Sequence, residues 1–530
     1  MNKKEQKQKP VKQIPKKKLF WFRLAGVMMP FLFLLLLELV LRLFHYGYNT
    51  DLFIEYPGNK DYLVMNPDAS RKYFSDQAIA TTGNTEPFKK EKDDNTLRIF
   101  VLGESTTIGY PYFHNASFHR WLQYRIDRGL PDKNLEIINC ALTAVNSYTV
   151  LGFAKQVVNY QPDAVLIYVG HNEYYGALGV GSTDRLGGNP LMIGILLRLR
   201  QLRIAQLVAN TWQGLIRLFR TKQSFSGKTR MELMVGEQKI AYESNLFNRG
   251  IEQFRMNMDA TLSYLNRYHI PVYVSNLVSN EKDLKPFVSA MPDTLTVPQF
   301  AENFRAGETA WQSAKYDTAL EYLNRAAKWY SGHARCNYYL GWLANHAGDS
   351  VAASRYFSKA LDLDELRFRA PHQLNEIIAA LCRKYPNTHL VDTRSEFERW
   401  SAHHIIGDEL ILEHVHPNLM GYALMADAFY QALKQGGLIT IPRGEELSFE
   451  ACLQEMPITA VDSLTGAIRI NRLRSSWPFS EVQRPATDSV VARTEERKLA
   501  EEIIDKELGW SQAMEELYAY SIGQHDLSKA

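Results

Sequence analysis

The stretch Arg98-Ile-Phe-Val-Leu-Gly-Glu-Ser-Thr-Thr-Ile-Gly109 decides the fold of this chain. Its apolar residues 99–102 are typical of the middle of a parallel strand that is covered on both faces. Gly103 ends the strand, so Glu104 and Ser105 lie at its carboxyl end, where open α/β sheets bind ligands. There Ser105 can offer a hydroxyl and a backbone N–H to a substrate carbonyl, or it can simply cap the following helix.

Apolar strands and amphipathic helices alternate over residues 97–437. The predicted strands are 98–102, 135–139, 163–169, 270–278 and 388–392. The predicted helices are 117–127, 148–160, 250–268, 372–383 and 418–435. This alternation predicts an α/β domain with a mostly parallel five-stranded sheet, right-handed crossovers and helices on both faces. Two gaps, 179–244 and 300–364, are too long for simple crossovers and are expected to be insertions.

The second insertion contains a repeat. Gly307, Ala319, Leu323 and Ala326 recur as Gly341, Ala353, Phe357 and Ala360, at a period of ~34 residues. Small residues at these places let two helices pack closely, and the pattern resembles tetratricopeptide repeats. We therefore expect an all-α pair of helical hairpins over 300–364, leaning on the α/β domain and available for docking a protein partner.

The first insertion includes a stretch, 196–220, that is rich in Leu, Ile and Arg at helical spacing. One interpretation is a lid or membrane-surface helix near the site. The other is a helix packed on the domain with an arginine-rich face in solvent. The sequence does not choose between them.

The N-terminus predicts a membrane anchor. Eight lysines precede residue 19, and the apolar stretch 19–44 follows. No small-x-small cleavage site comes after it, which favours an uncleaved signal anchor over a signal peptide. The positive-inside rule then places the tail 1–18 in the cytoplasm and exports everything after residue 44.

Composition narrows the remaining possibilities. The formal net charge is +3, and because the lysines cluster at the N-terminus the remainder is slightly acidic, which argues against nucleic-acid binding. The four cysteines are scattered without metal-ligand spacing. Residues 45–96 are interpreted as a lead-in and linker, and residues 438–530 as a helical C-terminal extension.

Three later stretches also follow predicted strands. They are Ile138-Asn-Cys-Ala141, Val169-Gly-His-Asn-Glu173 and Glu413-His-Val-His-Pro-Asn418. The carboxyl ends of parallel strands share one sheet edge, so all three can converge on Ser105.

This arrangement resembles the SGNH (GDSL-type) hydrolase family, whose fold is a three-layer, flavodoxin-like α/β domain. The resemblance implies that Ser105 is the nucleophile, His416 the general base and Glu413 the residue that orients it. It further implies an oxyanion hole formed by the Ser105 N–H, the Ala141 N–H and the side chain of Asn172. The neighbouring residue Glu173 is expected to anchor its loop or to meet substrate, and His171 is expected to line or cap the site, so both are substrate-binding candidates.

The chain departs from the family pattern at three places. Glu104 and Glu413 replace aspartates, and Ala141 stands where glycine is usual, so its N–H serves only if that residue does not need a positive φ. Asp408 competes with Glu413 as the orienting acid.

The expected function is therefore a membrane-anchored, extracytoplasmic ester hydrolase acting on acyl or acetyl esters of envelope glycans or lipids. An acyltransferase with the same acyl-enzyme is the first alternative. A non-catalytic envelope scaffold that acts through its repeats is the second. No metal or organic cofactor is implied by the sequence.

Overall fold

The computed structural model describes residues 15–526 except 114, 184–189, 220–229, 237, 293–296, 443, 481–493 and 507. Most of the lysine-rich tail and parts of the first insertion lie outside the described residues. The chain divides into two compact units. One comprises residues 1–49 and 194–225, and the other residues 50–193 and 226–530.

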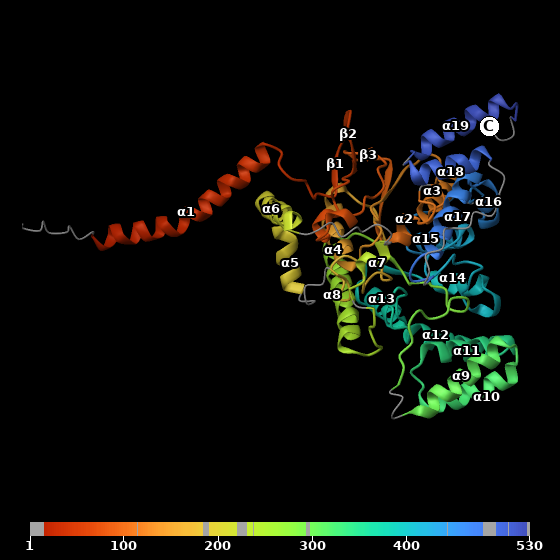
Figure 1. Ribbon diagram of the computed structural model, residues 1–530. Coiled ribbons are helices and arrows are strands. Elements are labelled where there is room, and N and C mark those ends of the chain that lie inside the picture. Colours follow the sequence, from red (N-terminus) through yellow and green to blue (C-terminus); the bar gives the residue numbers. More distant parts are fainter. Residues whose placement is uncertain are drawn as a thin grey trace, which may run out of the picture. The chain divides into compact units, whose positions relative to one another are not determined.

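The second unit is built on a five-stranded parallel sheet (Figure 1). Its strands are β4 (Thr96–Gly103), β5 (Asn134–Asn139), β6 (Ala164–Tyr168), β7 (Val272–Ser275) and β8 (Thr388–Val391). Their spatial order is β5-β4-β6-β7-β8. The predicted parallel sheet is confirmed. In this doubly wound order β5 is added on one side of β4, and β6, β7 and β8 are added on the other. The border between β4 and β6 is therefore a switch point, where open α/β sheets bind ligands.

Strand register aligns the functional strand ends. Phe100 of β4 lies opposite Ile138 of β5 and Val165 of β6, and Gly103 lies opposite Tyr168. All five residues of β6 are buried, as expected for a central strand with helices on both faces.

Two groups of helices cover the sheet. The first contains α4 (Ser147–Val157), α8 (Asn245–Arg267) and α13 (His372–Lys384), with α8 packing against both others. The second contains α3 (Phe118–Gly129), α14 (Thr393–Trp400) and α15 (Leu419–Gln435), with α15 between the other two. The domain also contains the short helices α2 (Ser105–Ile108) and α7 (Arg230–Met234). Its 3₁₀ turns lie at Arg71–Tyr73, Gln77–Ile79, Val158–Tyr160 and Ala402–His404.

The lead-in before the main sheet has structure that the sequence did not predict. It forms a small antiparallel sheet of β1 (Phe53–Tyr56), β2 (Asn59–Met65) and β3 (Phe88–Lys89). The rings of Phe53 and Phe88 meet edge to face, and both contact Phe100 of β4. Aromatic packing on the strand, rather than alternation within these short strands, holds this sheet in place.

The second insertion forms two helical hairpins. They are α9 (Pro298–Gln312) with α10 (Tyr316–Trp329), and α11 (Ala334–His346) with α12 (Ser350–Asp362). A Cβ placed on Gly307 would lie 2.7 Å from Leu323, and one on Gly341 would lie 3.0 Å from Phe357. The glycines of the repeat are therefore the points of close helix approach. Their assignment to the tetratricopeptide family stays a prediction.

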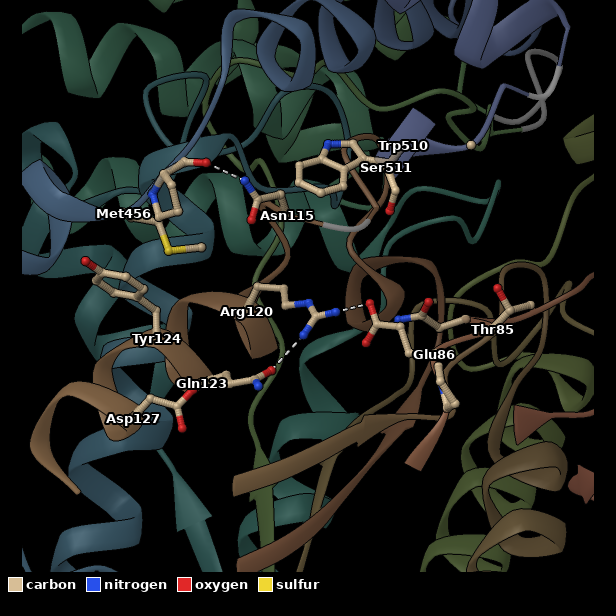
Figure 2. A pocket seen from close by; sticks show the side chains of 14 residues that line it. Thr85, Glu86, Asn115, Arg120, Gln123, Tyr124, Asp127, Met456, Trp510 and Ser511 are labelled. Atoms are coloured by element: carbon tan, nitrogen blue, oxygen red, sulfur yellow. Dashed lines mark hydrogen bonds and ion pairs between the residues drawn. The ribbon is translucent and has the colours of Figure 1, made fainter. Parts of the chain in front are cut away.

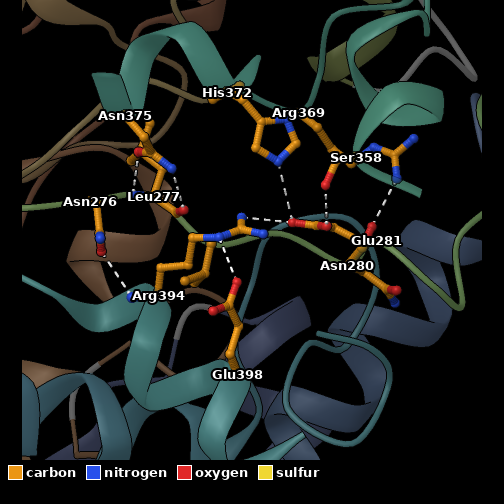
Figure 3. A network of polar contacts seen from close by, with 12 residues as sticks. Asn276, Leu277, Asn280, Glu281, Ser358, Arg369, His372, Asn375, Arg394 and Glu398 are labelled. Carbon is orange, nitrogen blue, oxygen red and sulfur yellow. Dashed lines mark hydrogen bonds and ion pairs between the residues drawn. The ribbon is translucent and has the colours of Figure 1, made fainter. Parts of the chain in front are cut away.

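A buried ionic network ties the second hairpin to the α/β domain (Figure 3). The Glu281 carboxylate is 1% exposed, lies 2.7 Å from the Arg394 guanidinium and accepts a hydrogen bond from Ser358 of α12. His372 lies 3.6 Å from the same carboxylate and 3.1 Å from Asp362. Burial lowers the pKa of His372, but these two acids outweigh it and raise the pKa to about 10. The protonated ring thus bridges the two carboxylates.

The C-terminal extension is helical, as the sequence predicts. Its helices are α16 (Phe449–Glu455), α17 (Ala460–Arg474), α18 (Glu495–Asp505) and α19 (Trp510–Gly523). The last three share a small core of their own, formed by Val461, Leu499, Ala500 and Ala513.

The other unit is described by itself. Its helix α1 (Lys16–Leu43) contains the one span among the described residues that is long and apolar enough to cross a membrane or act as a signal anchor. The Glu38 carboxylate of α1 accepts hydrogen bonds from the N–H groups of Arg203 and Ile204, both at 3.0 Å. Glu38 also pairs with Arg42, as its spacing predicts. It therefore caps the first turn of α6 (Arg203–Phe219), which follows α5 (Pro190–Leu199).

Candidate active site

Ser105 is the first residue of α2, immediately after the turn that ends β4. The turn is tight because a Cβ on Gly103 would collide with the side chain of Thr107 and the carbonyl oxygen of Tyr168. Thr107 Oγ1 donates to that same carbonyl at 2.7 Å, and its hydroxyl also accepts from the Glu104 N–H. The serine is therefore held at the start of a helical turn, with its hydroxyl at the sheet edge.

His416 lies beside the serine. Its Nε2 is 2.8 Å from Ser105 Oγ, and its Nδ1 contacts Glu413 Oε1. Because Nδ1 faces a carboxylate, that nitrogen carries the proton and Nε2 is left to accept one from the serine. The Leu412 N–H donates to the His416 carbonyl at 2.8 Å, and Asn418 caps α15, so this loop has a fixed shape.

Glu413 serves two imidazoles at once. Oε1 accepts from the N–H and ring of His416, and Oε2 accepts from the N–H and ring of His414. All three side chains are buried, and burial lowers the pKa of both histidines. Both rings are therefore neutral at neutral pH. The competing acid Asp408 instead accepts a hydrogen bond from Asn280 at 2.7 Å.

Asn172 faces Ser105 across the same pocket. Its backbone N–H donates to the buried Glu104 carboxylate at 3.2 Å. Glutamate at position 104 thus ties the loop after β6 to the serine turn, which positions the Asn172 side chain.

The structure does not place Ala141 where the sequence led us to expect it. The Ala141 N–H donates to Asn139 Oδ1 at 3.0 Å, so it is not free to bind an oxyanion. Ala144 lines the pocket with Ser105 and Asn172 instead, and its φ is +65°. Its N–H has no acceptor among the described residues. Positions 141 and 144 both hold alanine, so residue type alone does not distinguish the two N–H groups.

Of the two alternatives for Glu173, the contacts favour anchoring of its loop over contact with substrate, and His171 has a similar supporting position. Glu173 is fully buried and accepts hydrogen bonds from Ser147 Oγ at 2.8 Å and Gln253 Nε2 at 2.5 Å. Burial raises the pKa of Glu173 to about 7. His171 pairs with the Tyr168 hydroxyl at 3.0 Å and accepts from the Ala370 N–H at 3.3 Å. Both side chains support the loops around the site, and neither is among those that line the pocket.

The pocket beside Ser105, hereafter the Ser105 pocket, has a volume of about 270 Å³. Its walls are mostly apolar and include Tyr110, Phe113, Met231, Met234, Phe368 and Leu473. These residues come from loops and helices far apart in the sequence, and no local pattern marks them. The walls suit an acyl group of modest size.

Among the described residues, one group of acidic and histidine side chains has its potential metal-ligand atoms within 4.8 Å of one another. It consists of Glu413, His414 and His416. In the arrangement observed, both Nδ1 atoms face the carboxylate. The three side chains then form a hydrogen-bonded set, which needs no cation to hold it together.

No family model and no curated protein matches the chain. Among solved structures it is similar to an acetylxylan esterase from Geobacillus stearothermophilus (10% identity, 67% of this chain and 99% of that chain, TM-score 0.30). It is also similar to an esterase from Pseudoalteromonas (12% identity, 65% and 100%, TM-score 0.28) and a lipase/acylhydrolase from Enterococcus faecalis (12% identity, 66% and 100%, TM-score 0.28). The function proposed below depends on the site geometry.

Proposed function

We propose that this chain is a serine ester hydrolase of the SGNH type that works through an acyl-enzyme. The observation that carries the proposal is the continuous contact from Ser105 Oγ to His416 Nε2 at 2.8 Å, and from His416 Nδ1 to Glu413. A nucleophile, a base and an orienting acid joined in this way are the signature of nucleophilic catalysis.

In the first half-reaction Ser105 Oγ attacks the ester carbonyl while His416 takes the serine proton. Glu413 keeps the proton of His416 on Nδ1 and stabilises the imidazolium that forms. The oxyanion is held by the Ser105 N–H, the Ala144 N–H and the Asn172 side chain. His416 then protonates the leaving alcohol.

In the second half-reaction His416 takes a proton from water, the resulting hydroxide attacks the acyl-enzyme, and the acid leaves while Ser105 regains its proton. If a sugar hydroxyl takes the place of water, the same residues perform acyl transfer. The apolar Ser105 pocket supports an acyl or acetyl ester as the substrate. It does not favour water over an alcohol, so the acyltransferase stays the second candidate.

The deciding experiment is labelling with a fluorophosphonate, which traps only an activated serine. We expect the label on Ser105, and we expect none in Ser105→Ala. The exposed Ser313 provides a matched control, and Ser313→Ala should label fully. Absence of label from the folded protein would favour the non-catalytic scaffold. Mass spectrometry of products formed with and without an added sugar then separates hydrolysis from transfer.

We also propose that α1 anchors the chain in a membrane with its N-terminus in the cytoplasm and its body outside. The exposed apolar side chains Val208, Trp212 and Leu215 lie on α6, whose N-terminus Glu38 caps. We place this face of α6 at the membrane surface, which develops one of the two interpretations of its sequence. A reporter fused after residue 60 should be active only outside the cytoplasm. Activity only inside would contradict this topology.

The hairpins of residues 300–364 are proposed to dock a protein partner and to supply no reacting group. A folded protein that lacks them should still accept the fluorophosphonate at Ser105. Loss of labelling with the fold intact would refute this assignment.

A further inference from the structure

The Ser105 pocket adjoins the first of two larger cavities, which adjoin each other. Phe113 and Thr143 line both the Ser105 pocket and a middle cavity of about 480 Å³. Asn84 and Trp510 line both the middle cavity and an outer cavity of about 670 Å³. The three cavities therefore follow one another from Ser105 to Trp510, and each shares wall residues with the next.

The C-terminal extension supplies one wall of this path. The Trp510 indole N–H donates to Asp462 Oδ1 at 2.8 Å, and the other oxygen of Asp462 accepts from Thr459. Asp462 is itself buried. The hydrogen bond from its N–H therefore fixes the orientation of the indole, and the same side chain lines the cavity. Such a fixed aromatic surface loses little entropy when a ligand packs on it.

The outer cavity combines aromatic side chains with hydrogen-bonding groups of several kinds (Figure 2). Arg120 pairs with Glu86 and donates to Gln123 Oε1 at 2.7 Å, so it lies between two acceptors. Asn84 Oδ1 is buried with no hydrogen-bond partner in the described structure. Tyr124 contributes a second ring from α3, the helix that also carries Arg120.

From these walls we propose that the outer and middle cavities bind a carbohydrate chain. Sugar hydroxyls both donate and accept hydrogen bonds. They are therefore matched better by walls with amides and a carboxylate–guanidinium pair than by walls of a single charge sign. The flat C–H faces of a pyranose pack on aromatic rings. A fatty chain would leave Asn84 Oδ1 without a partner, at the cost of a desolvated polar group.

This proposal deepens the proposed function, on which its link to Ser105 rests. The ester-bearing sugar would enter the Ser105 pocket, and neighbouring sugars of the same chain would occupy the cavities toward Trp510. Residues of the outer cavity would then add affinity for polymeric substrates and none for a small aryl ester, which cannot reach them.

The test separates binding from catalysis. The full-length Ser105→Ala protein, solubilised in detergent, is titrated by calorimetry with xylohexaose, cellohexaose, chitohexaose and their partly O-acetylated forms. We expect at least one to bind, and we expect Trp510→Ala and Gln123→Ala in that background to weaken it on the order of tenfold. Trp329→Ala is the matched control, since Trp329 is exposed on α10 and lines none of the three cavities, and it should bind as the parent does.

A second readout uses the active protein. Trp510→Ala and Gln123→Ala should raise KM for an acetylated polysaccharide and leave kcat/KM for p-nitrophenyl acetate unchanged. Gln123→Ala keeps the inference testable if Trp510→Ala disturbs the C-terminal helices. The inference is overturned if no oligosaccharide binds, or if both variants bind as tightly as the control. Oligosaccharide binding without any esterase activity would instead overturn the proposed function and leave the carbohydrate site standing.

Discussion

The shared carboxylate of Glu413 makes Glu413→Gln an informative change. In the structure four N–H groups converge on its two oxygens, namely the backbone and ring N–H groups of His414 and His416. A glutamine offers one oxygen and one NH₂ group. One of the two histidines must therefore face a donor where it now faces an acceptor.

The size of the effect depends on which histidine that is. If the NH₂ group faces His416, the ring proton moves to Nε2, which points at Ser105 and can no longer take its proton. That tautomer error lowers kcat by about 10⁴. If the NH₂ group faces His414, His416 keeps its tautomer and loses only the negative charge that stabilises its cation. We therefore expect a fall in kcat of about 10²–10⁴.

The assay is hydrolysis of p-nitrophenyl acetate, with circular dichroism to show that each variant is folded. Ser105→Ala and His416→Ala should each lower kcat by about 10⁴ or more, and the double variant should be scarcely worse, because the two residues act as a unit. Asp408→Asn is the matched control and should be nearly silent. If Asp408→Asn were more damaging than Glu413→Gln, the orienting acid would be misassigned. Full activity in Ser105→Ala would refute the mechanism.

Four further outcomes are expected. Asn172→Ala should remove one oxyanion donor and lower kcat by about 10²–10³ with little change in KM, and an unchanged kcat would exclude that role. Because burial lowers the pKa of His416, the acid limb of kcat/KM should fall below pH 6.5, and a midpoint above 6.5 would contradict a neutral buried base. Glu281→Gln should cost about 3–5 kcal/mol in denaturant unfolding, since it leaves Arg394 and His372 short of a buried counter-charge. The raised pKa of His372 means that its share of the stability is complete below pH 6.5 and is lost as pH rises toward about 10, a decline that His372→Gln should abolish.

Some of the site followed from the sequence because its signals are local. The buried strand before Gly103, the serine after it and the histidine before Pro417 each lie at a strand end or a helix cap that a short window can identify. Parallel strands then bring such ends to one edge whatever their separation in the chain. For this reason the convergence of these stretches could be predicted, while the roles of Ser105 and His416 came from the resemblance to the SGNH family. The repeat over 300–364 could be located by its period.

Other expectations failed where a backbone angle or a distant partner decided the outcome. The oxyanion donor from the loop after β5 must be a backbone N–H with no other acceptor. The Ala141 N–H donates to Asn139, whereas Ala144, at φ +65°, lines the pocket. Likewise the sequence left two roles open for Glu173, and its partner Gln253, on another helix, holds it in the interior. Nothing within either loop encodes these choices.

The sequence by itself determined the alternation of strands and helices, the apolar N-terminal helix and the position of the repeat, because each of these depends on residues close to one another. The tertiary structure alone decided that one carboxylate serves two imidazoles and that Trp510 lines the outer and middle cavities. Cavities and buried hydrogen bonds form between segments that meet only after folding. Their geometry is set by packing across the whole domain, which no local pattern records.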